Sequence, residues 1–182
     1  MGFKVHVAFL LFAAFLGASA YDRLEQGDCP NEFLSYPGGR CLHVSTAYVS
    51  GDPKVYQWEP AREACLNMTT EGWTVDLAFS LDEEVMQRFS EFIVNEVPSM
   101  KYYVFFVGAE RDTPSGHWEW VDGQLVDPLS YVWNINQPSS SQDAYVKTML
   151  VPSGAHNRFY MIAIRAVERG PSFLCEAAPK CD

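Results

Sequence analysis

The sequence contains few basic residues, few histidines and no apolar run long enough to cross a membrane. Among its 182 residues, 13 are Lys or Arg and 23 are Asp or Glu, which gives a formal net charge of −10. Nucleic acids and anionic membranes are bound through clustered basic side chains, so the composition argues against both as partners. The longest apolar run, residues 5–16, is about half of the ~20 residues that a membrane span requires.

Sequence patterns of common catalytic sites are also missing. Beyond residue 20 the histidines are His43, His117 and His156, which lie far apart and do not form the His-Glu-x-x-His spacing of a zinc site. There is no Gly-x-Ser-x-Gly motif to present a serine nucleophile. We therefore predict that the protein is not an enzyme and has no catalytic residues, and we interpret each histidine as a surface or strand residue.

Residues 1–20 have the pattern of a secretory signal peptide. Lys4 precedes the apolar run, and Gly17-Ala18-Ser19-Ala20 follows it as a small-residue cleavage site. The mature chain, residues 21–182, then has 182 − 20 = 162 residues and a charge of 12 − 23 = −11, and its size is typical of one domain. We expect it to be secreted and extracellular. Two interpretations of its excess of acidic residues are open: they keep the protein soluble, or they form a surface that binds calcium or mineral.

Five cysteines behind a signal peptide predict disulfide bonds. Cys29 and Cys41 flank the turn sequence Tyr36-Pro37-Gly38-Gly39, so a hairpin closed by these two cysteines fits the local geometry. Asn67-Met68-Thr69 is an acceptor sequence for N-glycosylation. In a secreted protein such a sequence marks Asn67 as a surface position.

Helical periodicity is confined to the first half of the mature chain. Residues 56–66 carry Trp58, Ala61 and Cys65 at helical spacing, so these residues are expected to face the core. A second helix is expected after Ser80, which we predict as its N-cap with Glu83 as capping-box partner. Its apolar stripe consists of Leu81, Val85, Phe89, Phe92 and Ile93. Pro98 is expected to end it.

From residue 102 onward, β-type residues replace the helical period. The expected strands are 102–107, 117–121, 144–151, 159–167 and 172–176, with turn residues such as Gly154 and Gly170 between the last of them. Two helices followed by short strands and one long loop predict an α+β domain.

Several motifs follow one another in an order that is typical of a known family. They are Phe106-Val107-Gly108-Ala109, Trp118-Glu119-Trp120, Asp122-Gly123, Gln137-Pro138-Ser139 and the closing Phe173-Leu174-Cys175-Glu176. This order resembles the C-type lectin-like domain, and the spacing of Trp58, Ala61 and Cys65 matches the first helix of that family. The resemblance covers residues 29–176. It leaves 21–28 as an amino-terminal extension and 177–182 as a carboxy-terminal tail.

The resemblance implies a disulfide-stapled fold in which two helices pack on short antiparallel strands with a long loop region. It pairs Cys65 of the first helix with Cys175 of the last strand, and it is consistent with a bridge between Cys29 and Cys41. Cys181 is then left over, either to link two chains into a dimer or to carry a small capping molecule.

The second core disulfide of the family has no counterpart in this sequence. Its two cysteines would fall on Ala144 and on Ala166 or Val167. Because both halves are lost together, we expect two facing apolar residues to pack where the family has a bridge.

Sugar-binding members of the family hold calcium through a set of oxygen ligands that this sequence lacks. The corresponding places fall on Gln137 and Ser139, on Gln142, and on Ala163-Ile164. Calcium takes 6–8 oxygen ligands and depends on carboxylates for affinity, but none of these residues is a carboxylate, and Asp143 is the one acid nearby. We therefore expect no standard calcium site and no other cofactor.

The family resemblance implies a recognition protein that binds a carbohydrate or cell-surface glycoconjugate, such as a microbial surface, in innate immunity. We hypothesise that its ligand-binding loop makes direct hydrogen bonds without metal. The loop residues in question are Asn136, Gln137, Ser139, Gln142 and Asp143. A merely solvated loop is the alternative. Two other functions stay open: a calcium-independent protein-binding module that has lost sugar binding, and an acidic extracellular-matrix or mineral-associated protein.

Overall fold

The computed structural model describes residues 29–36, 40–46, 56–96, 98–100, 103–111, 116–138, 147–153 and 158–180. The predicted signal peptide, the extension at 21–28, and positions Ser139, Gln142, Asp143, Ala144 and Cys181 lie outside these residues. The elements are β1 (Leu34–Tyr36), β2 (Arg40–Thr46), α1 (Trp58–Leu66), β3 (Trp73–Leu77), α2 (Glu83–Asn95), a short 3-10 helix (Pro98–Met100), β4 (Phe105–Arg111), β5 (Trp118–Trp120), β6 (Lys147–Ser153), β7 (Arg158–Ile164) and β8 (Ser172–Pro179).

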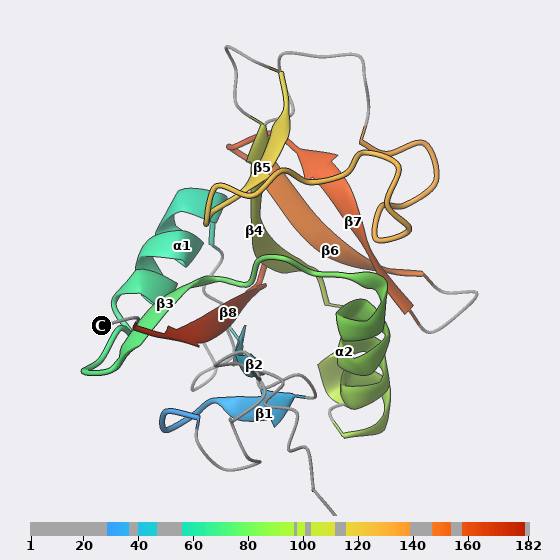
Figure 1. Ribbon diagram of the computed structural model, residues 1–182. Helices are drawn as coiled ribbons and strands as arrows, with labels where there is room; N and C mark the ends of the chain where they lie inside the picture. Colours follow the sequence, from blue (N-terminus) through green and yellow to red (C-terminus); the bar gives the residue numbers. More distant parts are fainter. Residues whose placement is uncertain are drawn as a thin grey trace, which may run out of the picture.

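The strands of the described residues form one sheet in the order β1-β2-β8-β4-β6-β7, with β3 paired to β8 and β5 paired to β4. All pairs are antiparallel except β4 with β8, which run parallel. Strand β8 is central, because it pairs with β2, β3 and β4 (Figure 1). It extends to Pro179, which pairs with Trp73, so part of the predicted tail belongs to the sheet.

The two helices cover opposite sides of the sheet and each has its own apolar cluster (Figure 1). Side chains alternate along β4: Phe105 and Val107 join the cluster of α2, whereas Phe106 joins that of α1. Phe89 of α2 meets Phe105 and Phe159 edge-on, with ring centroids 5.3 and 5.2 Å away. Helix α1 buries Trp58, Ala61 and Cys65, as predicted from their spacing. The α+β class expected from the sequence is therefore confirmed.

Helix α2 begins later than predicted. Its N-cap is Asp82, whose Oδ1 accepts a hydrogen bond from the amide of Val85 at 2.8 Å. The prediction of Ser80 as the cap was wrong, because an N-cap residue needs an extended backbone and Ser80 has a φ of 49°. The Ser80 hydroxyl is instead buried without a hydrogen-bond partner among the described residues. No helix in the described part of the chain is long and apolar enough to cross a membrane.

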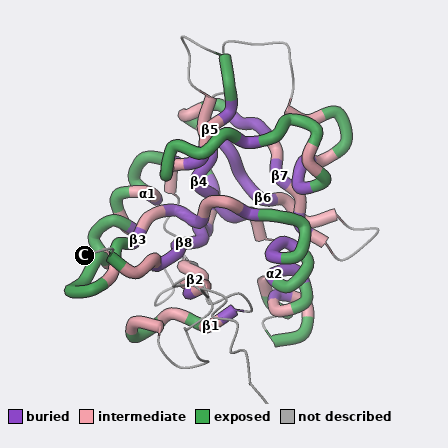
Figure 2. Tube along the Cα trace, viewed as in Figure 1, coloured by how far each residue is buried: buried purple, intermediate pink, exposed green. Residues whose placement is uncertain are grey.

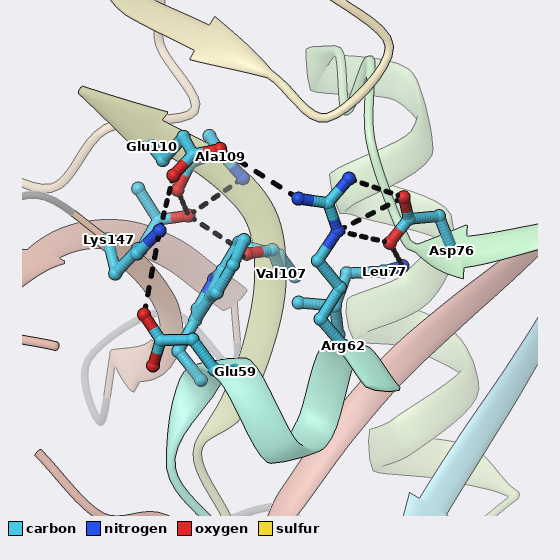
Figure 3. A network of polar contacts seen from close by, with 10 residues as sticks. Glu59, Arg62, Asp76, Leu77, Val107, Ala109, Glu110 and Lys147 are labelled. Atoms are coloured by element: carbon cyan, nitrogen blue, oxygen red, sulfur yellow. Dashed lines mark hydrogen bonds and ion pairs between the residues drawn. The ribbon is translucent and has the colours of Figure 1, made fainter. Parts of the chain in front are cut away.

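Two disulfides and a polar network hold the elements together. The bridges join Cys29 to Cys41 and Cys65 to Cys175, the pairs that the family resemblance implies. Figure 3 shows Arg62 of α1 reaching Asp76 of β3, with 2.9 Å between Nη2 and Oδ2, on one side of the network. On its other side Lys147 of β6 bonds to Glu110 of β4, and its Nζ lies 4.0 Å from the ring centroid of Trp58. These contacts fix α1 against β3, β4 and β6.

Candidate functional site

The candidate site starts at the turn that follows β5. Asp122 Oδ1 accepts from the backbone amide of Gln124 at 3.0 Å, and the Gln124 side chain donates to Asp122 Oδ2 at 2.9 Å. Gly123 has a φ of 87°, a backbone region that glycine enters without steric cost. The Asp-Gly pair read from the sequence is therefore a tight turn that reverses the chain.

The Asp122 turn is fixed to the sheet at Gly108 of β4. The Val121 amide donates to the Gly108 carbonyl at 2.7 Å, and the Gly108 amide donates to the Ala78 carbonyl at 2.8 Å. A Cβ atom at position 108 would lie 2.7 Å from the carbonyl oxygen of Leu77 and 2.9 Å from Val121 Cγ2. Only glycine lets these three segments approach so closely.

The long loop, which we define as residues 125–138, is built around Trp133. This side chain is 6% exposed, packs edge-on against Trp118 with ring centroids 5.2 Å apart, and donates its indole N–H to the Asp127 carbonyl at 3.1 Å. The Asp127 carboxylate in turn accepts from the Leu129 amide at 2.8 Å. The loop is therefore ordered from inside, by a buried aromatic ring and a capped turn.

Strand β7 provides the support on the other side of the long loop. The Met161 amide donates to the Val132 carbonyl at 2.7 Å, and the Asn134 amide donates to the Met161 carbonyl at 2.9 Å. Further along, the side-chain Oε1 of Gln137 accepts from the Ala163 amide at 3.0 Å. Gln137 is half-buried, and this bond makes it an anchor of the loop to the sheet.

The long loop exposes four large apolar side chains. Figure 2 shows much of it exposed. Its large exposed side chains are Leu125 (67% exposed), Leu129 (88%), Tyr131 (80%) and Ile135 (85%). Asp127 is the one charged residue of the stretch. Single exposed apolar side chains are common on protein surfaces, whereas several large ones on one ordered loop are a feature of interaction sites.

The described residues at the places of the family's calcium ligands do not fit a calcium ion. Ala163 and Ile164 are each 6% exposed and offer aliphatic side chains, and the side-chain oxygen of Gln137 is already bonded to Ala163. Nowhere in the described ranges do three or more His, Cys, Asp or Glu side chains gather closely enough to hold a metal. The described residues therefore offer no ligand set for calcium at this place.

Two residues of the predicted ligand-binding loop lie within the described residues. Asn136 is exposed and has a φ of 62°, whereas Gln137 faces β7. Ser139, Gln142 and Asp143 lie outside the described residues. Val167, one expected partner in an apolar contact replacing the family's second disulfide, is 64% exposed. Ala166, the other candidate at this place, is half-buried, and the expected partner Ala144 lies outside the described residues, so the apolar contact stays a prediction.

The exposed apolar residues of the long loop were missed in reading the sequence. Leu129, Tyr131 and Ile135 are exposed, whereas the neighbouring Val132 and Trp133 are buried, so the exposed residues follow no simple period along the chain. The signal that distinguishes them is the turn sequence Asp127-Pro128, which interrupts strand formation and favours a loop.

No protein-family model matches the chain, and no curated protein matches it in sequence. Solved structures do match it. The C-type lectin CEL-I from Cucumaria echinata has a TM-score of 0.64 at 14% identity, with 84% of this chain and 99% of that chain covered. Human lithostathine has a TM-score of 0.61 at 18% identity, with 83% and 91% covered.

A third neighbour is the cow C-type carbohydrate-recognition domain of CD23, solved in the presence of a GlcNAc2Man3 oligosaccharide. It has a TM-score of 0.60 at 17% identity, with 84% of this chain and 98% of that chain covered. The described elements, the two disulfides and these neighbours agree with the resemblance carried by the motifs. The chain has the C-type lectin-like fold.

Proposed function

We propose that this protein is an extracellular recognition module that binds glycans through its long loop without calcium. The observation that carries the proposal is the Tyr131 ring, which is 80% exposed on a loop fixed by the buried Trp133. An exposed aromatic ring can stack on the apolar C–H face of a sugar. The exposed amide of Asn136 on the same loop can donate to and accept from sugar hydroxyls.

Glycans are the preferred ligand class because of what similar proteins bind. Besides cow CD23, the neighbours include the murine dendritic cell inhibitory receptor 2 domain in complex with N-glycan, at 15% identity, and a protein named SPL-1 in complex with GlcNAc, at 16% identity. A shared fold does not fix a shared ligand. The assignment to this chain therefore depends on Tyr131 and Asn136 and is tested through them.

The proposed setting is extracellular. Residues 1–20 would direct secretion, Asn67 would carry an N-glycan, and Cys181 would link two chains or remain capped. Asn67 follows the last residue of α1 and is exposed, as an acceptor asparagine must be. Microbial surface glycans in innate defence are the ligands that we would test first.

The test is binding of the secreted full chain to an array of glycans and bacterial polysaccharides, once with calcium and once with chelator. We expect the same sugars to be bound in both conditions. Binding lost in chelator would contradict the metal-free site. Tyr131→Ala and Asn136→Ala should each abolish most of the signal. Leu34→Ala serves as the control, because Leu34 is also exposed but lies on β1, at the other edge of the sheet from β7.

A second candidate function is supported by the aliphatic part of the same surface. Leu129 and Ile135 are the two most exposed large apolar residues described, and aliphatic side chains contribute little to sugar binding but much to protein interfaces. Silence on the array in both conditions, together with capture of a specific secreted or surface protein that Leu129→Asp abolishes, would move the assignment to a protein-binding module.

A further inference from the structure

A cavity separate from the long loop lies between the β1–β2 hairpin, the segment that joins β3 to α2, and the Asp122 turn. Its volume is about 430 Å³, within the usual range for small-molecule sites. We call it the hairpin cavity. Its lining includes Tyr36, Phe79, Ser80, Asp82, Asp122 and Glu176. The inner residues Tyr36 and Glu176 are buried, and Asp82 and Asp122 are exposed at the rim.

The floor of the hairpin cavity is an ion pair in which four of the five guanidinium N–H groups are already bonded. Arg40 Nε donates to Glu176 Oε1 at 2.7 Å, and its Nη2 bonds to the other carboxylate oxygen. Its Nη1 donates to the Ser80 carbonyl at 3.0 Å, and Nη2 also bonds to the Phe79 carbonyl. The guanidinium therefore holds the segment between β3 and α2 onto β8.

Two hydroxyl groups on residues that line the hairpin cavity are buried and have no hydrogen-bond partner among the described residues. They are the phenol of Tyr36, a residue 8% exposed, and the Oγ of Ser80. Within the described ranges, four buried side-chain polar atoms lack a partner, and these are two of them. Buried polar atoms are nearly always bonded. The Tyr36 and Ser80 hydroxyls therefore leave hydrogen-bonding capacity unused in the wall of the hairpin cavity.

The charge of the lining favours a cation. Its ionised side chains are Arg40, Arg88, Asp82, Glu84, Asp122 and Glu176, a sum of 2 − 4 = −2. The charge of Arg40 is neutralised by its ion pair with Glu176. At the exposed rim, Arg88 Nη2 lies 3.9 Å from Glu84 Oε1. Asp82 and Asp122 remain. Each can accept further hydrogen bonds, because a carboxylate has about four acceptor positions and one or two are used here.

We propose that the hairpin cavity binds a primary ammonium group on an aliphatic stem. An ammonium has three N–H donors and no acceptor, which complements a lining rich in unused acceptors. Its methylene groups would lie against Phe79 and Val85, the apolar residues of the wall. A sugar, which needs donors as well as acceptors, is less well matched. The ammonium can come from a free amine or from the lysine side chain of a protein.

The experiment titrates isotope-labelled full chain, with its disulfides intact, with n-butylammonium and follows backbone amide shifts. We expect saturable shifts around the hairpin cavity with a Kd of about 1 to 30 mM, a weak affinity suited to a ligand of so few atoms. Butanol, which has the same stem without the charge, should bind at least about tenfold more weakly. A capped Gly-Lys-Gly peptide forms the second arm: tighter binding of the peptide assigns the lysine of a protein, and binding of butylammonium alone assigns a free amine.

Two variants locate the binding. Asp122→Asn should weaken binding about fivefold and Tyr36→Phe about threefold, through the loss of one charge or one acceptor. Tyr36→Phe removes an unpaired hydroxyl and should leave the fold intact. Glu63→Gln removes an exposed charge on α1 and should change nothing, as should Tyr131→Ala in the long loop. The proposal is overturned if shifts do not saturate, if Glu63→Gln weakens binding as much as Asp122→Asn, or if glucose binds at the cavity and butylammonium does not.

Discussion

Tyr36 lies at the end of β1 with only 8% of its surface exposed. Its position before Pro37-Gly38-Gly39 predicted the hairpin, but nothing in the local sequence indicated that its phenol would be buried. Burial is decided by α2, because Phe92 meets the Tyr36 ring edge-on with centroids 6.0 Å apart. Gln137 is a similar case: its place in a Gln-Pro motif was recognised, and only the tertiary fold turns its side chain toward Ala163 of β7.

The burial of Tyr36 predicts a loss of stability at high pH. Desolvation raises the pKa of the phenol well above its ordinary value of 10.0, so the folded state keeps the proton that the unfolded chain releases. Stability is therefore unaffected below pH 10 and falls as pH rises through and beyond that value. Between pH 8 and 11 the free energy of unfolding should fall by about 1.4 kcal/mol from this residue. Urea unfolding at pH 8 and pH 11 measures the change.

Tyr36→Phe is the control for this alkaline effect. The variant keeps the other tyrosines and lysines, so subtracting its pH dependence from that of the unmodified protein isolates the phenol. Equal losses in both proteins would mean that the Tyr36 hydroxyl ionises freely in the folded state and is not shielded from water.

The elements show a different limit of prediction. Both helices and the strands β4 to β8 were expected from periodicity and turn residues, with ends displaced by a few positions. Strand β3 was missed, because its residues Val75 and Leu77 run on into Ala78 and Phe79 and were interpreted as the approach to α2. It forms because the free edge of β8 is available, with Leu77 opposite Cys175.

Gly108 on β4 gives a prediction at the scale of elements. Gly108→Ala should lower the free energy of unfolding by about 2 to 3 kcal/mol, because the new methyl group meets the Leu77 carbonyl at 2.7 Å and strands β3 and β4 must separate. Gly170→Ala is the matched control. Its Cβ would meet only side-chain atoms, the nearest Met149 Cε at 3.1 Å, and these can shift. Chemical denaturation should rank Gly108→Ala well below Gly170→Ala, and similar losses would contradict the role of backbone contact.

At the scale of the molecule, the fold was readable from spaced motifs because each motif marks a tertiary contact. Trp58 and Cys65 mark the contact of α1 with the sheet, and Gly108 marks the closest approach of β3, β4 and the Asp122 turn. The candidate site was less readable. The aliphatic residues at the positions of the family's calcium ligands could be inferred by alignment with the family. The exposed apolar side chains of the long loop could not, because their exposure depends on how the burial of Trp133 orients the loop.

The two disulfides differ in how much of the chain they constrain, and this difference predicts their contributions to stability. They close loops of different length, with sequence separations of 110 for Cys65–Cys175 and 12 for Cys29–Cys41. In the chain-entropy model such loops stabilise by about 5 and about 3 kcal/mol. Replacing Cys65 and Cys175 together by alanine should therefore cost about 2 kcal/mol more than replacing Cys29 and Cys41, as measured by urea unfolding of the purified chains.

The positions of the two disulfides also predict which backbone amides lose protection when each bridge is removed. Cys65–Cys175 fastens α1 to the central strand, so its removal should expose amides of both α1 and β8 to hydrogen exchange. The hairpin bridge ties only residues near the edge strand β1, so its removal should speed exchange there and leave β8 protected by β3 and β4. Equal losses of stability and of amide protection in the two double variants would contradict this prediction. They would mean that α1 is held on the sheet by the Arg62–Asp76 pair and the packing of Trp58, and not by the Cys65–Cys175 bridge.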